Sequence, residues 1–203
     1  MKVICLTGGL ASGKSTAVKH LAARGAVVID ADILGHQAYN SGTAAFDDVI
    51  AAFGDDVRGD DGEIDRKVLG GKVFGKPEEL RKLTDIVWPE IRRLAELELD
   101  IIAGSSPDAI VVLEAAVLFE AGWEDIGEEI WVLTVDRETA IERSMARDNA
   151  PRDAVERRLD SQLSNEVRTS RADIVVTNDS SVAAMLNQVD SAFDKSTGAS
   201  GTG

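Results

Sequence analysis

The residues best suited to chemistry stand near the start of the chain, in the stretch GGLASGKST at positions 8–16. Gly8, Gly13, Lys14 and Ser15 match the spacing G-x-x-x-x-G-K-[ST]. Its glycines let successive main-chain N–H groups turn into one hollow, its lysine reaches terminal phosphates, and its hydroxyl binds Mg²⁺. The alternative is a glycine-rich turn with an exposed lysine. We predict a nucleotide phosphate site, whose cradle is completed by Gly9, Ala11, Ser12 and Thr16.

Three acidic residues follow predicted strands. Asp30 and Asp32 come directly after an apolar run at 26–29, and Glu114 follows another at 109–113. Ligands of parallel α/β sheets bind at the carboxyl edge, where the phosphate loop also emerges. Asp32 could accept a proton from an attacking hydroxyl or order Mg²⁺ through water, and Glu114 could hold Mg²⁺ or its waters. The alternatives are a helix cap for the aspartates and a solvated strand end for Glu114.

Cations that could meet phosphates gather around the stretch DNAP. Arg143 and Arg147 are four positions apart, so they share one face of a predicted helix. An arginine-bearing hairpin over the phosphates could exclude water and stabilise transferred charge, as a kinase lid does. Ordinary surface pairing with Glu142 and Asp148 is the alternative. The stretch LFEAGW adds Phe119, Glu120 and Trp123 as pocket-wall candidates, although core packing explains the two aromatic residues equally well.

Short apolar runs alternate with helical patterns, which predicts a parallel sheet covered by helices on both faces. We expect strands at 3–6, 26–29, 109–113, 130–135 and 174–177, and helices at 14–23, 33–39, 43–53, 65–74, 78–103, 137–147, 151–164 and 180–193. Trp88-Pro89 should kink or end the helix that contains it. One domain is expected over 1–193, with a helical substrate subdomain at 33–103, a lid at 143–165 and a flexible tail at 194–203.

Composition narrows the possible partners and location. The chain has 203 residues, a net charge of −14 and one cysteine, Cys5. This acidity argues against nucleic acid or membrane partners, and a single cysteine favours a reducing cytoplasm. The first residues do not resemble a signal peptide. His20 and His36 lack neighbouring ligands, so no metal is expected beyond Mg²⁺ bound with the nucleotide, and nothing indicates an obligate protein partner.

In order along residues 1–181, the chain carries LTGGLASGKST, GAVVIDAD, EIDRKVLGGKVFG, VLFEAGW, ERSMARD and ADIVVTNDSS. This ordered set resembles dephospho-coenzyme A kinase. The usual bacterial pattern has histidine before the proline where this chain has Trp88, and PLLFE where it has AVLFE. Both departures resemble the kinase domain of the animal bifunctional coenzyme A synthase, without its adenylyltransferase half, so we expect a stand-alone kinase of that subtype.

The resemblance implies the P-loop nucleoside-triphosphate hydrolase fold of the small-molecule kinase type, and transfer of phosphate from ATP to the ribose 3′-hydroxyl of dephospho-CoA. It implies that Asp32 is the base or orienter for that hydroxyl, that Arg66 is a substrate-side cation, that Arg147 lies near the ATP phosphates and that Asn178 lies near adenine. From their positions in the sequence we also expect Arg143 at the ATP phosphates and Glu120 on the substrate side.

Other functions stay open at this point. Another small-molecule kinase, for nucleosides or shikimate, fits the same loop and helical insertion. A nucleotide-binding regulator of the GTPase type would need an N/T-K-x-D motif, and TNDS at 177–180 lacks the lysine. A catalytically inactive adaptor fits poorly with intact Lys14, Ser15 and Asp32.

Overall fold

The computed structural model describes residues 1–198 and divides them into two compact units. Met1–Ile29 and the chain from Ile102 onward form the first unit, and Asp30–Ile101 form the second. Each unit has its own internal packing.

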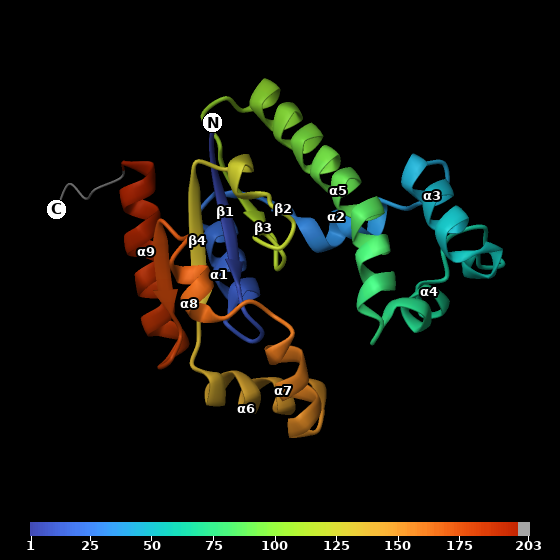
Figure 1. Cartoon of the computed structure of the whole chain (residues 1–203). Helices are drawn as coiled ribbons and strands as arrows, with labels where there is room; N and C mark the ends of the chain where they lie inside the picture. The colour runs from blue at the N-terminus through green and yellow to red at the C-terminus, as the bar shows by residue number, and fades with distance from the viewer. Residues whose placement is uncertain (199–203) are drawn as a thin grey trace. The chain divides into compact units, whose positions relative to one another are not determined.

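The first unit contains a five-stranded sheet in the order β2-β3-β1-β4-β5 (Figure 1). Its strands are β1 Lys2–Gly8, β2 Val27–Asp30, β3 Ile110–Glu114, β4 Glu129–Thr134 and β5 Ile174–Thr177. β1 pairs in parallel with β3 and β4, and β4 pairs in parallel with β5. The predicted parallel sheet is therefore confirmed. β1 lies at its centre, between strands reached from later parts of the chain, and in such sheets the crevice at this point binds ligands.

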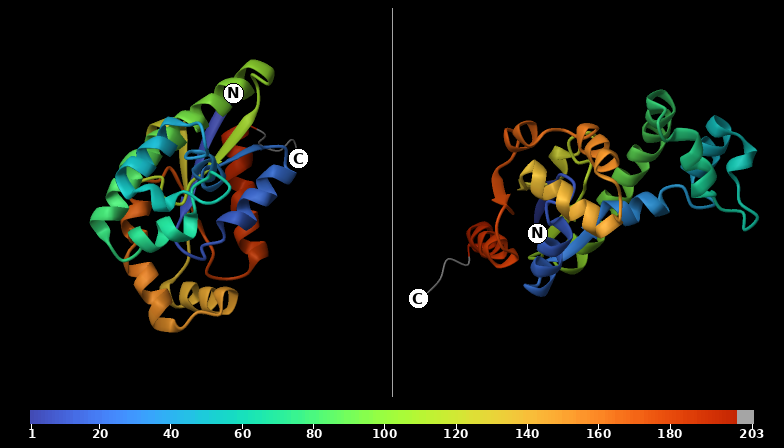
Figure 2. Two further views of the ribbon diagram at one scale, coloured as in Figure 1. Left: turned by 90° about the vertical axis from the view of Figure 1, so that its right-hand side faces the viewer. Right: turned by 90° about the horizontal axis from the view of Figure 1, so that it is seen from below.

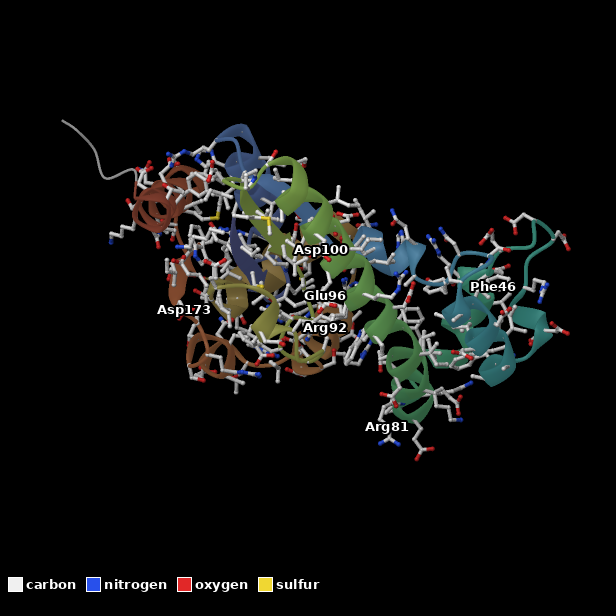
Figure 3. All side chains as sticks on the ribbon, turned by 90° about the horizontal axis from the view of Figure 1, so that it is seen from above. Phe46, Arg81, Arg92, Glu96, Asp100 and Asp173 are labelled. Carbon is white, nitrogen blue, oxygen red and sulfur yellow. The ribbon has the colours of Figure 1, made fainter. Side chains whose placement is uncertain are left out.

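Alternating side chains of the central strand explain why the sheet needs cover on both faces. Ile4 and Leu6 point to one face, where they pack with α1 Lys14–Ala23 and α9 Val182–Thr197. Cys5 points to the other face and is also fully buried. Ile130, near the start of β4, is the partner of Cys5 in the sheet. Its main-chain N–H donates a 2.8 Å hydrogen bond to the carboxylate of Asp173, which is labelled in Figure 3.

Three helices lie between β4 and β5: α6 Arg137–Asp148, α7 Arg152–Asp160 and α8 Asn165–Thr169. α6 and α7 contact each other as a hairpin (Figure 2, lower part of the left view). The predicted single helix over 151–164 is wrong, because α7 ends at Asp160 and Ser164 starts a new helix by accepting from the N–H of Val167. This extra turn brings α8 against β4.

The second unit is helical, with α2 Ala31–Gln37, α3 Ala44–Phe53, the short 3₁₀ turn Asp55–Val57, α4 Arg66–Val73 and most of α5 Pro77–Ser105. Side chains cap three of these helices: Asp30 caps α2, Thr43 caps α3 and Asp65 caps α4.

Of the two alternatives predicted at Trp88-Pro89, a kink or a boundary, the boundary is wrong, because α5 continues through Pro89. The kink stays a prediction. Proline removes one N–H donor, but the buried stripe of α5 continues across it in steps of four, through Val87 and Ile91. Ion pairs such as Arg92–Glu96, 2.8 Å apart, also join successive turns (Figure 3). Packing of one continuous face therefore outweighs the local cost of the proline.

At the other end of the chain, α9 continues to Thr197, beyond the predicted end at 193. The remainder of the predicted tail, residues 199–203, lies outside the described residues. Among the described helices, none is both long and apolar enough to cross a membrane.

Candidate active site

The phosphate loop follows β1 and adopts a shape that depends on its glycines. A Cβ on Gly8 would stand 2.4 Å from the carbonyl oxygen of Leu133. Gly13 has φ 97° and Ala11 has φ 56°, both in the left-handed region. The chain thus turns back on itself before α1 begins, as predicted from the glycine spacing, and it forms a concave row of main-chain groups.

The start of α1 supplies donors at this row. Gly13 caps α1 without any side-chain hydrogen bond, so the positive end of the helix is not covered by a capping side chain. Within the described chain, the main-chain N–H groups of Ala11, Gly13 and Ser15 meet no acceptor. Lys14 extends its ammonium group back along the loop, to the carbonyl oxygens of Gly8 at 2.9 Å and Gly9 at 3.2 Å. An anion seated on the loop would meet all of these donors.

A hollow of about 330 Å³ lies over this loop, and the two arginines predicted from α6 form part of its wall. Arg143 is half-buried and donates to the main-chain carbonyl of Asn178 at 3.0 Å. Arg147 is more exposed and pairs with Asp148 through two hydrogen bonds of 2.7 and 2.9 Å. The hollow is lined by Ala11, Ser12, Gly13, Lys14, Ser15, Thr16, Arg143 and Arg147.

Asp148 organises the hairpin of α6 and α7. Besides Arg147 it accepts from Arg158 of α7 at 2.8 Å. These two arginines hold the pKa of the Asp148 carboxyl well below its usual range, first Arg147 and then Arg158. The predicted alternative of surface pairing is therefore correct for Arg147 and Asp148, yet Arg147 still lines the hollow. If Arg147 paired with a phosphate group in place of Asp148, its guanidinium would become a charged donor to the nucleotide.

Apolar and polar contacts attach this hairpin to the phosphate loop. Leu10 of the loop packs with Ile141 of α6 and Val155 of α7. Beside this contact the side chain of Gln162 accepts a 3.0 Å hydrogen bond from the main-chain N–H of Leu10. The hairpin that was predicted as a lid thus contacts the loop at Leu10.

Asn178 lies against the loop. It is 4% exposed, and its side-chain amide donates to the carbonyl of Ser12 at 3.0 Å. A Cβ on Gly13 would come within 2.5 Å of this amide nitrogen, so the glycine also makes room for it. Contact with the adenine base stays a prediction, whereas support of the loop by Asn178 is seen directly.

Candidate ligands for Mg²⁺ lie at the carboxyl ends of the strands and the start of α1. In the pairing of β1 and β3, Glu114 stands opposite Leu6, two residues before the loop begins. Ser15 is exposed in the first turn of α1. Hydroxyl and carboxylate oxygens are ligands that Mg²⁺ accepts, usually with phosphate and water completing its shell. No group of three potential metal ligands occurs among the described residues.

The stretch after β3 contains both core and polar residues. Phe119 and Trp123 are 5% and 3% exposed, which supports the core interpretation for both. The ring of Phe119 lies under the guanidinium of Arg171, 4.4 Å from its centroid. Glu120 instead faces Arg168 of α8, with 3.4 Å between Oε1 and Nη2.

Arg168 is the residue of this region that sequence reasoning missed. Its 2% exposure makes it a buried cation beside the phosphate loop. The sequence offered little signal, because Arg168 is one of several arginines in a polar stretch and its burial depends on α8.

Two further predicted residues belong to the second unit. Asp32 is exposed in the first turn of α2, where its main-chain N–H is capped by Asp30 at 2.8 Å. The carboxylate of Asp32 meets no hydrogen-bond donor among the described residues of this unit, so Asp30 is the cap. Arg66 donates to the carbonyl of His36 at 3.0 Å and lines a hollow of about 470 Å³ together with Tyr39.

The fold and the loop together define a P-loop kinase. The chain is similar to a protein from Thermus thermophilus, at 31% identity over 96% of this chain and 97% of that one, with a TM-score of 0.81. The dephospho-CoA kinase from Campylobacter jejuni is 26% identical over 98% and 99%, with a TM-score of 0.74. A shikimate kinase from Acinetobacter baumannii, 14% identical with a TM-score of 0.52 over 98% and 95%, shares the fold alone.

Sequence comparison is more specific. The dephospho-CoA kinase family model matches residues 2–184. The dephospho-CoA kinase of Geobacter sulfurreducens is 42% identical over 195 residues, 96% of this chain and 98% of that protein. That of Geobacter metallireducens is 41% identical over 178 residues, 88% of each.

The chain therefore belongs to the dephospho-CoA kinase family, and it is a phosphotransferase of coenzyme A biosynthesis. The predicted family is confirmed and is favoured over the other kinases and the regulator considered above. These relatives are bacterial, so they do not test the likeness to the animal bifunctional enzyme, which stays a prediction.

Proposed function

We propose that this protein transfers the γ-phosphoryl group of ATP to the ribose 3′-hydroxyl of dephospho-CoA, giving CoA and ADP. The observation that carries the proposal is a complete phosphate loop with two arginines at one hollow, in a chain that matches the family along nearly its whole length. Such a loop binds the phosphates, and the arginines add positive charge where charge is transferred.

In this proposal the chain positions and stabilises the phosphates. Main-chain N–H groups of the loop and the ammonium of Lys14 bind them, because Lys14 already lies along the inner side of the loop. Arg143 and Arg147 neutralise charge from the α6 side. Asp32 accepts the proton of the attacking hydroxyl or orients that hydroxyl. This role is supported by the exposure of the Asp32 carboxylate, which accepts no hydrogen bond from the described residues of the second unit.

Mg²⁺ would be held together with the nucleotide by the Ser15 hydroxyl. Glu114 would bind the ion directly or through a water molecule. When bound, the ion would neutralise part of the negative charge of the phosphates. On the acceptor side the proposal assigns Arg66 and Glu120. Arg66 is supported by its exposed position on a hollow of about 470 Å³, large enough for part of a nucleotide-sized ligand.

All partners in this proposal are small molecules. Neither nucleic acid nor a membrane surface fits a chain of net charge −14, and no obligate protein partner is needed for the chemistry. The single cysteine and the acidic composition support a cytoplasmic location.

A substrate panel tests the proposal. The purified protein is given ATP and Mg²⁺ with dephospho-CoA, shikimate or a nucleoside, and ADP release is measured for each. We expect ADP release above background with dephospho-CoA alone, and a new 3′-phosphate monoester in the ³¹P spectrum of the product. Phosphorylation of another acceptor at a higher kcat/KM, or of a different hydroxyl, would contradict the proposed substrate or site.

A further inference from the structure

A second hollow borders the phosphate loop at residues that the first hollow does not touch. Its volume is about 360 Å³, and Gly9 and Leu10 form its loop wall. Arg168, Gln162 and Asn165 contribute polar side chains to the same hollow. Neither Arg143 nor Arg147 lines it. Its cations are Arg168 and Arg137, the first residue of α6, which is paired with Asp160 at 2.8 Å, and the carboxylates of Asp136 and Glu166 lie on the same wall.

Arg168 is unusually placed for an arginine. Its side chain is 3% exposed, and its Nε makes no hydrogen bond with any residue the structure describes. The guanidinium donates to the carbonyl of Leu163 and faces Glu120 at 3.4 Å, a long contact for a buried ion pair. Arginine has five N–H donors, and this environment provides hydrogen-bond acceptors for only some of them. Burying an incompletely paired charge is costly, which points to a ligand that completes the pairing.

The position of Arg168 indicates which chemistry it would meet. Its Nη1 stands 3.5 Å from the place of a Cβ on Gly9, so the guanidinium lies directly over that residue. The ammonium of Lys14 lies 3.2 Å from the carbonyl oxygen of the same Gly9. Two cations therefore converge on the start of the loop, whereas the other hollow covers residues 11–16.

Burial also affects the charge of this group. Loss of hydration lowers the pKa of the Arg168 guanidinium from its ordinary value, and the negative charge of Glu120 opposes this shift. The guanidinium group of arginine nevertheless stays protonated in proteins. Arg168 thus offers a permanent planar donor set, which suits two oxygens of one phosphoryl group.

We propose that Arg168 binds the terminal phosphoryl group of ATP at the Gly9 end of the phosphate loop. The inference rests on the proposed ATP-dependent transfer, but not on the identity of the acceptor. Glu120 holds the guanidinium in place before the nucleotide arrives. Arg168 then neutralises charge on the group that moves, which lowers the barrier to its transfer.

Nucleotide binding tests this without the acceptor. With Mg²⁺ present, calorimetry compares ADP with the ATP analogue that has nitrogen between its β- and γ-phosphates. For Arg168→Gln combined with Glu120→Gln, which leaves no lone buried charge, we expect the Kd of the analogue to rise about 10- to 100-fold, the value of a hydrogen bond to a charged group. The Kd of ADP should change less than about threefold. The control is Arg157→Gln on α7, where Arg157 is 70% exposed and pairs with Asp153.

Thermal unfolding of each variant separates binding from folding. A double variant that unfolds at the wild-type temperature and has lost affinity for the analogue alone supports the proposal. Arg168→Lys keeps the charge and serves if the double variant does not fold, with the same expected loss of analogue affinity relative to ADP. Equal losses for both nucleotides, or no loss for either, would overturn the proposal. If dephospho-CoA proved not to be the acceptor, these nucleotide-binding results would be unchanged. The proposed acceptor and the proposed role of Arg168 can therefore be refuted independently.

Discussion

The side-chain amide of Asn178 donates a 3.0 Å hydrogen bond to the main-chain carbonyl of Ser12, in the middle of the phosphate loop. The two residues are 166 positions apart in the chain. Asn178 follows β5, and its own carbonyl accepts from Arg143 of α6. One buried residue thus connects the loop, the end of the sheet and α6, and it holds the main chain of the loop in place.

Replacement of Asn178 by aspartate should weaken both the fold and nucleotide binding. A carboxylate would face the Ser12 carbonyl without a donor, inside a site that attracts anions. We expect the free energy of unfolding to fall by about 1–3 kcal/mol, and the Kd for ATP to rise. Denaturant unfolding and calorimetry measure the two effects. Asn187→Asp, on the exposed side of α9, makes the same chemical change and should alter neither.

Lys14→Ala should reduce kcat by at least about 100-fold, because a cation at the transferring group stabilises charge in the transition state. The secondary structure should be retained, because alanine is a good helix former in the first turn of α1. Steady-state kinetics and circular dichroism provide the measurements. Lys19→Ala, on the exposed face of the same helix, is the control. A folded Lys14 variant with a near-normal rate would rule out the loop mechanism.

Asp32→Asn tests the proposed base. Asparagine keeps the shape but cannot take a proton, so kcat should fall by about 10²–10⁴-fold, the usual worth of general-base help. The lower end is expected because phosphoryl transfer needs little base assistance. Calorimetry should show nearly unchanged ATP affinity. Asp30→Asn is the matched control, since an amide oxygen can still cap α2. If kcat of the Asp32 variant equals that of wild type, the acceptor site must lie elsewhere.

Pro89→Ala should stabilise the protein. Proline inside a helix is about 3 kcal/mol less favourable than alanine, and the greater freedom of the unfolded chain offsets about 1 kcal/mol of that gain. We therefore expect a net increase of about 2 kcal/mol in the free energy of unfolding, measured with denaturant. Pro77→Ala is the comparison, because Pro77 is the first residue of α5, where proline is tolerated. An unchanged or lower stability for Pro89→Ala would show that α5 depends on a local distortion.

The contact between α1 and α9 should depend on pH through Asp190. Its carboxylate bonds to His20 at 2.8 Å and to Arg24 at 2.9 Å. These partners, His20 first, lower the pKa of Asp190 from its ordinary value of 3.8. A carboxyl whose pKa falls on folding stabilises the fold above 3.8, and this contribution is lost as pH drops through the native pKa. Asp190→Asn should thus be less stable than wild type at pH 7.

The same comparison at pH 3 and below should show a smaller difference, since wild-type Asp190 is then progressively protonated. Urea unfolding at both pH values measures it. Asp48→Asn on α3, with an exposed side chain, should show no such dependence. A constant difference between wild type and Asp190→Asn at all pH values would mean that the carboxylate charge is irrelevant there.

Local sequence patterns predicted much of this molecule, for reasons that are visible in the structure. The helix 14–23 has the predicted bounds, because the glycines before it and Gly25 after it set its ends through their own backbone preferences. The strand 174–177 also matches, as a short apolar run between polar turns. The helix over 151–164 was wrong, because Ser164 caps a separate turn that competes with continuation of the helix.

By itself, the sequence determined the class of fold, the phosphate loop and the family. These depend on residue types at fixed spacing, which sterics and main-chain hydrogen bonding convert directly into local structure. Only tertiary structure decided that α5 runs through Pro89, that Asn178 supports Ser12 and that Arg168 is buried beside Gly9. Each of these depends on packing between segments far apart in the chain, and the desolvation and contacts that packing creates have no counterpart in local propensity.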